Sequence, residues 1–141
     1  MPRIEPSCVS RVEIMLFYDL FRGEPRTRAL PAGVSLFRRG DATNGFMYVL
    51  IKGQAEIRVG DEVVDLARVG AILGEMALVD KGPRSATVVA TTDAEFAEID
   101  RERFEFLIAE TPGFAIEVMR LMASRLRKTD ELLSRRVAAL V

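Results

Sequence analysis

Short apolar segments separated by turn-forming residues run from Thr27 to Ile99, and this pattern constrains the fold more than any other feature of the chain. Residues 30–33 fit a type I turn with proline at its second position, and Gly40, Gly53 and Gly60 mark further turns. By these turn signals we count about eight short strands. They include segments at 34–38, two within 46–59, and others at 62–68, 87–91 and 95–99. The pattern predicts a β sandwich or barrel.

Helical signals flank this β region on both sides. Residues 10–21 combine a capping box with apolar residues at helical spacing, which predicts a short N-terminal helix. Asp100 is placed to cap a second helix, and Thr111 followed by Pro112 predicts the start of a long helix that ends near Val137. The sequence therefore predicts one domain, residues 1–141, that is mainly β from about 26 to 100 and helical from about 101 to 137.

The long helix carries an apolar stripe and many basic residues. The stripe comprises Ile116, Met119, Met122, Leu126, Leu133 and Val137. The basic residues are Arg120, Arg125, Arg127, Lys128, Arg135 and Arg136. Because cations toward a helix C-terminus also interact favourably with the helix dipole, we interpret them as a solvent-exposed face rather than a nucleic-acid-binding patch. The stripe is compatible with a short dimer interface, which polar Thr129 interrupts.

The composition excludes several kinds of site. The 141 residues include no histidine, so histidine-ligated metal sites and histidine-based catalysis are excluded. A formal net charge of −1 gives no overall attraction to nucleic acid or to anionic membranes. The single cysteine, Cys8, permits no internal disulfide, and no apolar run approaches membrane-spanning length. We expect a cytoplasmic protein that has no metal, no cofactor and no membrane segment, and that is not an enzyme.

Residues 74–88 place opposite charges around a tight turn. Gly74 permits close approach of the backbone, and one short helical turn then suits the next residues, with its first N–H groups facing an anion. Arg84 offers a planar fork of donors that suits a phosphate, and the Ser85 hydroxyl adds another donor. These residues predict a pocket that holds a phosphate and, through the acceptor Glu75, a neighbouring sugar hydroxyl. The alternative is a Glu75–Arg84 salt bridge across the turn.

This stretch resembles the phosphate-binding cassette of the cyclic-nucleotide-binding domain family, in which a Gly-Glu pair, small apolar residues and a short loop precede Arg, a small residue and Ala. The resemblance implies an antiparallel β-roll with a short N-terminal helix, a cassette helix and a long C-terminal helix. It also implies that Glu75 accepts a hydrogen bond from the ribose 2′-hydroxyl and that Arg84 pairs with the cyclic phosphate. The ligand-binding residues that it implies in the cassette are Gly74, Glu75, Met76, Ala77, Arg84 and Ser85.

Residues 125–131 resemble the central helix of bacterial catabolite activator proteins, in which a Thr-Ser pair reaches the adenine from both subunits of a dimer. Thr129 falls on the threonine position, whereas Asp130 replaces the serine. The resemblance implies that Thr129 contacts the base and that the long C-terminal helix can form a homodimer. Ser85 stands where cGMP-preferring members of the family tend to carry threonine, so we expect cAMP to be preferred to cGMP.

The sequence thus predicts a sensor domain that binds cAMP, or less favourably cGMP, and couples ligand binding to movement of its C-terminal helices. No recognition helix fits after the long helix, so we expect no direct DNA binding by this chain. Two alternatives stay open. One is a ligand-free protein-interaction domain of the same fold, and the other is a cupin-like enzyme, whose sites usually need the histidine ligands that this chain lacks.

Overall fold

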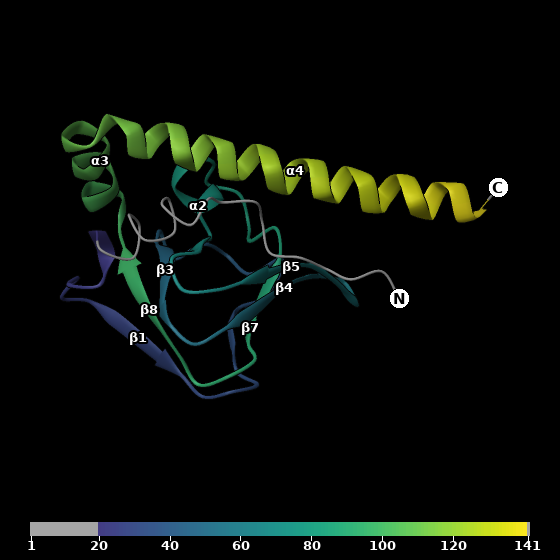
Figure 1. The fold of residues 1–141 in the computed structure, drawn as a ribbon, viewed down its shortest axis with the longest axis horizontal. Coiled ribbons are helices and arrows are strands. Elements are labelled where there is room, and N and C mark those ends of the chain that lie inside the picture. The colour runs from purple at the N-terminus through teal and green to yellow at the C-terminus, as the bar shows by residue number, and fades with distance from the viewer. Residues whose placement is uncertain (1–19, 141) are drawn as a thin grey trace.

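The computed structural model describes residues 20–140 as two four-stranded sheets and a set of helices (Figure 1). One sheet has the order β1-β8-β3-β6 and the other has the order β2-β7-β4-β5. The strands are β1 (Thr27–Leu30), β2 (Ser35–Phe37), β3 (Met47–Lys52), β4 (Ala55–Val59), β5 (Glu62–Ala67), β6 (Ile72–Leu73), β7 (Thr87–Ala90) and β8 (Ala94–Ile99). All of the paired strands are antiparallel, so the mainly β fold with flanking helices, an antiparallel β-roll, is confirmed.

Strand β3 lies at the centre of the core and is buried on both faces. Met47, Val49 and Ile51 belong to the cluster that packs against the helices, where Phe104 and Phe114 meet edge to face at 5.9 Å. The intervening residues Tyr48 and Leu50 belong to the cluster between the two sheets. Because successive side chains of a strand point to opposite faces, β3 joins the two parts of the core. Five of its six residues are buried, and only Lys52 is exposed.

Three helices complete the described structure: α2 (Met76–Val79), α3 (Arg101–Glu110) and α4 (Pro112–Leu140). The Asp100 carboxylate accepts a hydrogen bond from the Arg103 N–H at 2.8 Å, which confirms the predicted cap of α3. Pro112 is the first residue of α4, as predicted, because the missing proline N–H leaves no helical bond unmade at that position. The predicted N-terminal helix lies outside the described residues except for positions 20 and 21, which are helical.

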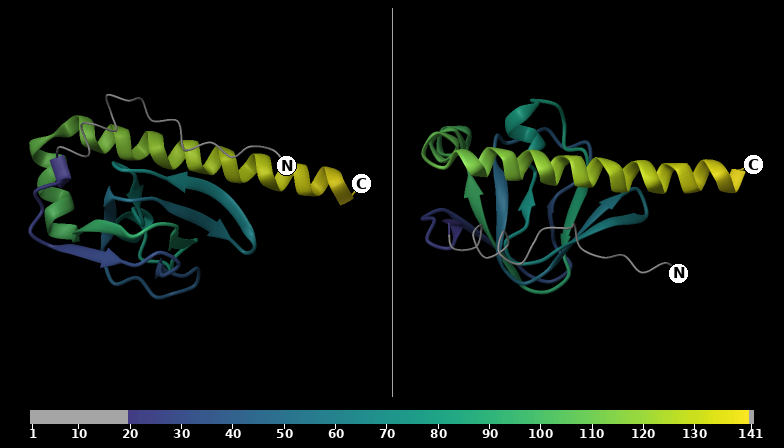
Figure 2. Two further views of the ribbon diagram at one scale, coloured as in Figure 1. Left: turned by 60° about the horizontal axis from the view of Figure 1, so that its bottom comes forward. Right: turned by 45° about the horizontal axis from the view of Figure 1, so that its top comes forward.

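Helix α4 lies across one end of the β-roll, over α2 and β5, and its last turns extend past the strands (Figures 1 and 2). The N-terminal part of α4 packs on the roll through Phe114, Val118 and Leu121, which are all buried. The cassette turn and the start of β7 lie beneath the middle of the helix, so a pocket forms between them. Within residues 20–140, no helix is both long enough and apolar enough to cross a bilayer.

Candidate functional site

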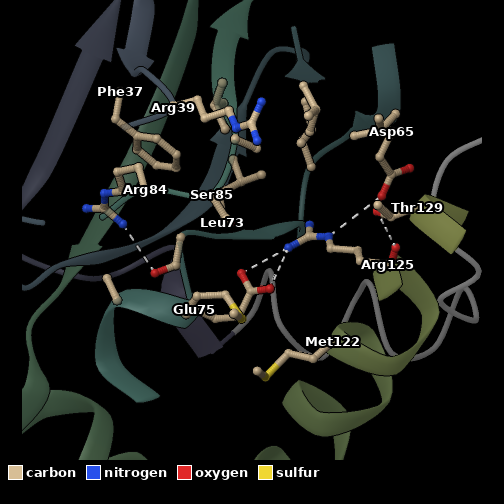
Figure 3. A pocket seen from close by; sticks show the side chains of 18 of the residues that line it. Phe37, Arg39, Asp65, Leu73, Glu75, Arg84, Ser85, Met122, Arg125 and Thr129 are labelled. Atoms are coloured by element: carbon tan, nitrogen blue, oxygen red, sulfur yellow. Dashed lines mark hydrogen bonds and ion pairs between the residues drawn. The ribbon is translucent and has the colours of Figure 1, made fainter. Parts of the chain in front are cut away.

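A cavity of about 350 Å³ lies between the cassette turn, the β4–β5 wall and helix α4 (Figure 3). Its volume falls in the range of small-ligand pockets. Every residue predicted to bind the ligand lines it: Gly74, Glu75, Met76, Ala77, Arg84, Ser85 and Thr129. Ile57, Val59 and Val64 form the wall opposite the cassette. Met122 and Leu126 belong to the side of the cavity that helix α4 forms. The fold therefore brings residues more than forty positions apart in the sequence to one site.

Arg84 is buried at 6% exposure, and neutral groups hold its guanidinium. Its Nη2 donates to Asn44 Oδ1 at 2.8 Å and to the Phe46 carbonyl at 2.9 Å, and its Nη1 donates to the Gly74 carbonyl at 3.3 Å. The guanidinium carbon lies 4.2 Å from the centre of the Phe37 ring, a cation–π contact. Among residues 20–140, no carboxylate forms an ion pair with Arg84.

The electrostatic environment of Arg84 reflects this burial. Desolvation lowers the pKa of the guanidinium, and electrostatic interactions with Tyr48, Asp41 and Glu75 act in the opposite direction. Burial of a charge without an ion partner costs free energy that hydrogen bonds to neutral acceptors offset only in part. An anion bound beside Arg84 would therefore be stabilised by a cation that is already desolvated.

Gly74 is required by both its backbone conformation and its surroundings. Its φ of +72° lies in the left-handed region, which residues with a side chain rarely adopt. A Cβ at this position would lie 2.5 Å from Arg84 Nη1 and 3.2 Å from the Phe37 ring. The close approach predicted for this glycine is thus an approach of the turn to the Arg84 side chain. The next turn closes through the Ala77 N–H, which donates to the Gly74 carbonyl at 3.1 Å.

Glu75 is buried at 4% exposure and pairs with helix α4, not with Arg84. Arg125 Nη1 donates to both carboxylate oxygens of Glu75, at 3.1 and 3.0 Å. The predicted alternative, a salt bridge across the cassette turn, is therefore absent from the described structure, and the partner of Glu75 lies fifty positions away. A carboxylate has four lone-pair sites, so Glu75 can still accept a further hydrogen bond.

The interpretation of the basic residues of α4 as one solvent-exposed face is wrong for Arg125 and Lys128. Asp65 of β5 is 2% exposed, and Lys128 Nζ lies 3.1 Å from its Oδ1. Arg125 Nε lies 3.7 Å from Asp65 Oδ2, too far for a hydrogen bond, and is buried without an acceptor among the described residues. By contrast, Arg136 pairs with Glu62 where both side chains are largely exposed. The helix thus presents part of its basic surface to the pocket.

A sequence signal for these contacts exists but is weak. Asp65 is a carboxylate in an otherwise apolar stretch of β5, and a charged residue there calls for a partner. Met122, Arg125 and Thr129 share one face of α4 because residues three and four apart are neighbours on a helix. Neither pattern identifies the partner element, because the two are joined only by the docking of α4 on the roll.

Thr129 and Ser85 lie at the exposed rim of the pocket. The Thr129 hydroxyl donates to the Arg125 carbonyl one turn earlier, at 3.0 Å. That bond uses the hydroxyl proton and leaves the lone pairs of Oγ1 able to accept from a donor in the pocket. Figure 3 shows Thr129 and Ser85 on different sides of the cavity, so one ligand would have to bridge them to contact both.

Comparison with known proteins agrees with this geometry. Residues 27–111 match the family model described as the cyclic nucleotide-binding domain. The chain is 34% identical over 117 residues to the cyclic AMP receptor protein of Thermus thermophilus. This match covers 79% of this chain and 54% of that protein. It is also 34% identical over 115 residues to a lysophospholipase of Lodderomyces elongisporus, over 74% of this chain and 8% of that enzyme.

A solved structure shows the same fold. The crystal structure of the catabolite activator protein of Thermus thermophilus aligns with a TM-score of 0.69 at 30% sequence identity. The alignment covers 92% of this chain and 61% of that chain. In sequence, the chain spans only about half of the Thermus receptor protein and a small part of the lysophospholipase.

Proposed function

This chain belongs to the cyclic nucleotide-binding domain family, and we propose that its pocket binds a cyclic mononucleotide and that the domain acts as a sensor. The observation that carries the proposal is Arg84, a buried cation that bonds only neutral acceptors at the wall of the cavity. A cyclic phosphate supplies the anion that this cation lacks. Since the guanidinium is already held and desolvated, its interaction with a phosphate requires little further ordering.

The other lining residues suit the remaining parts of such a ligand. Ser85 adds a hydroxyl donor for the phosphate, and Glu75 keeps lone pairs for the ribose 2′-hydroxyl. Gly74, Met76 and Ala77 form the turn over which the sugar and phosphate would lie. Thr129 Oγ1 can accept from the adenine amino group, whereas guanine presents a carbonyl at that position. We therefore propose cAMP as the preferred ligand, in agreement with the name of the Thermus relative.

Helix α4 connects the pocket to the rest of the molecule. Arg125 holds Glu75, and Lys128 holds Asp65, so two ion pairs join the helix to the lining of the cavity. A ribose hydroxyl that bonds Glu75 changes the acceptor that Arg125 shares. We propose that this contact transmits occupancy of the pocket to α4. The ligand moves the helix to a second position only to the extent that it binds the protein with a different affinity when α4 is in that position.

The exposed apolar residues of α4 support a homodimer, and one of them, Leu126, also lines the pocket. Met119, Leu126, Leu133 and Leu140 recur at the seven-residue spacing of a coiled coil, and each is between 59% and 87% exposed. The intervening set of the same seam is Ile116, Ala123, Asp130 and Val137. We propose that two copies of α4 pack along this seam, where Asp130 is the polar member. The last turns of the helix extend past the roll (Figure 1).

We also propose that the domain is regulatory rather than catalytic and that it works in the cytoplasm. The matched segment amounts to 8% of the lysophospholipase, so a domain of this kind forms a small part of an enzyme there. Regulation of an attached or associated protein is the role that the pocket and its connection to α4 support.

Calorimetric titration with cAMP and with cGMP tests the proposed function. We expect Arg84→Leu to lose about 2–5 kcal/mol of cAMP binding, or roughly 30- to 3,000-fold, because it removes one partner of a desolvated charge pair. Arg28→Leu, an exposed site on β1 outside the pocket, is the control and should bind as wild type does. Arg84→Lys keeps the charge but not the planar fork, and tests the phosphate contact if the leucine variant unfolds.

Two outcomes would contradict the proposal. Folded Arg84→Leu protein that binds cAMP within a few-fold of wild type would remove Arg84 from the phosphate site. Wild-type protein that binds neither nucleotide would favour the ligand-free interaction domain.

In the same titrations Thr129→Ala should lose about 1–2 kcal/mol of affinity for cAMP, the net contribution of one hydrogen bond, and should keep its affinity for cGMP.

A further inference from the structure

The charged residues that line the pocket do not balance. They are Arg39, Asp65, Glu75, Arg84, Arg125 and Lys128. The two carboxylates face the two cations of α4, since Glu75 pairs with Arg125 and Asp65 pairs with Lys128. The positive charge that remains belongs to Arg84 and Arg39, which both lie on the cassette side of the cavity (Figure 3).

These two arginines differ in their freedom to move. Three hydrogen bonds and the Phe37 ring hold the Arg84 guanidinium, and the side chain is buried. Arg39 is exposed at the mouth of the pocket, and among residues 20–140 no carboxylate forms an ion pair with it. Arg84 can therefore receive an anion only where it is, whereas Arg39 can reach toward one.

The backbone holds Arg39 next to the cassette. The Arg39 N–H donates to Thr87 Oγ1 at 2.9 Å. Just after it in the chain, the Gly40 N–H donates to the Arg84 carbonyl and the Arg84 N–H donates to the Asp41 carbonyl, both at 2.8 Å. The segment that follows β2 is thereby fixed against the loop that carries Arg84 and against the start of β7. The position of Arg39 beside Arg84 is a consequence of this pairing rather than of side-chain flexibility.

We propose that Arg39 is a second cation for the phosphate, which captures this anion at the mouth of the pocket before Arg84 holds it inside. The inference rests on the proposed function, because it assigns a role in binding the same ligand. An exposed charge at the rim of a site acts mainly on the association rate and on its salt dependence, whereas a buried, hydrogen-bonded charge acts on dissociation. Arg39 and Arg84 should therefore separate in kinetics.

The neighbouring Arg38 provides a matched control. It is also exposed and carries the same charge, but it does not line the pocket. Arg38→Gln and Arg39→Gln change the net charge of the protein equally, so a difference between them reports position and not total charge. Neither substitution removes a backbone hydrogen bond or a buried side chain.

Stopped-flow binding of a fluorescent cAMP analogue, at a series of salt concentrations, measures both rate constants. We expect Arg39→Gln to associate about 5- to 10-fold more slowly at low salt, with a weaker salt dependence and a dissociation rate within about twofold of wild type. Arg38→Gln should associate within about twofold of wild type, and Arg39→Lys should recover most of the lost rate because the charge returns.

Equal association rates for Arg39→Gln and Arg38→Gln would overturn the inference while leaving the proposed function intact. A loss that appears only in the dissociation rate would also overturn it, because Arg39 would then hold the ligand rather than capture it. Absence of cAMP binding by the wild-type protein would refute the proposed function and this inference together.

Discussion

Replacement of Arg125 by methionine removes the cation that joins helix α4 to the cassette. Methionine keeps much of the apolar length of the side chain, so the change isolates the charge. Glu75, 4% exposed, would lose the ion-pair partner it has in the structure, whereas Asp65 would keep Lys128 at 3.1 Å. Breaking a buried ion pair by removing one partner costs about 3–5 kcal/mol. Because the Arg125 side chain is 18% exposed and solvent screens part of the interaction, we expect a cost below this range, about 2–3 kcal/mol.

Thermal and urea unfolding followed by circular dichroism measure this cost. For a chain of this length about 1 kcal/mol corresponds to a shift of about 2–4 °C, so Arg125→Met should lower Tm by about 4–12 °C. A cycle with Glu75→Gln isolates the pair, since the double variant has no unpaired carboxylate at position 75. We expect the double variant to be more stable than additivity predicts, by about 1.5–3 kcal/mol.

Arg127→Met is the matched control, because Arg127 lies on the same helix, is exposed and does not line the pocket. A surface substitution of this kind should change stability by less than about 0.5 kcal/mol. The reasoning would be refuted if Arg125→Met cost no more than Arg127→Met, or if the coupling between positions 125 and 75 were below about 0.5 kcal/mol. Helix α4 would then be held on the roll by its apolar residues alone.

Two further predictions concern the sugar contact and the helix seam. The 2′-deoxy analogue of cAMP should bind wild type more weakly than cAMP, by about 1–2 kcal/mol in titration, yet lose little further in Glu75→Ala; equal binding of both ligands by wild type would remove Glu75 from the sugar contact. Leu133→Glu places a charge on the exposed seam of α4 and should convert a dimer to a monomer in sedimentation. The control Arg135→Glu lies off the seam and should leave the dimer intact. A wild-type protein that sediments as a monomer at high concentration would exclude the dimer.

The strands and the helix starts were predictable because their signals are local. A glycine or proline indicates a turn or a helix start through its own backbone, and a capping carboxylate bonds an N–H only three residues further along the chain. Gly53, Gly60, Asp100 and Pro112 could therefore be assigned from their neighbours in the sequence. The cassette could be assigned for the same reason, since its glycine, acid and arginine lie within one short stretch. Its role in binding stays a prediction.

The partners of the charged residues were not predictable from such signals. Asn44 and the Phe46 carbonyl hold Arg84 from about forty positions away, and Arg125 reaches Glu75 from fifty. Nothing in the spacing of the helix says which of its basic residues face the roll, because both faces contain cations. Periodicity determines which residues share a face of α4. The angle at which α4 docks on the roll is set by the packing of Phe114, Val118 and Leu121 on the core. Only this angle determines that Arg125 and Lys128 meet the buried carboxylates, whereas Arg127 and Arg135 meet solvent.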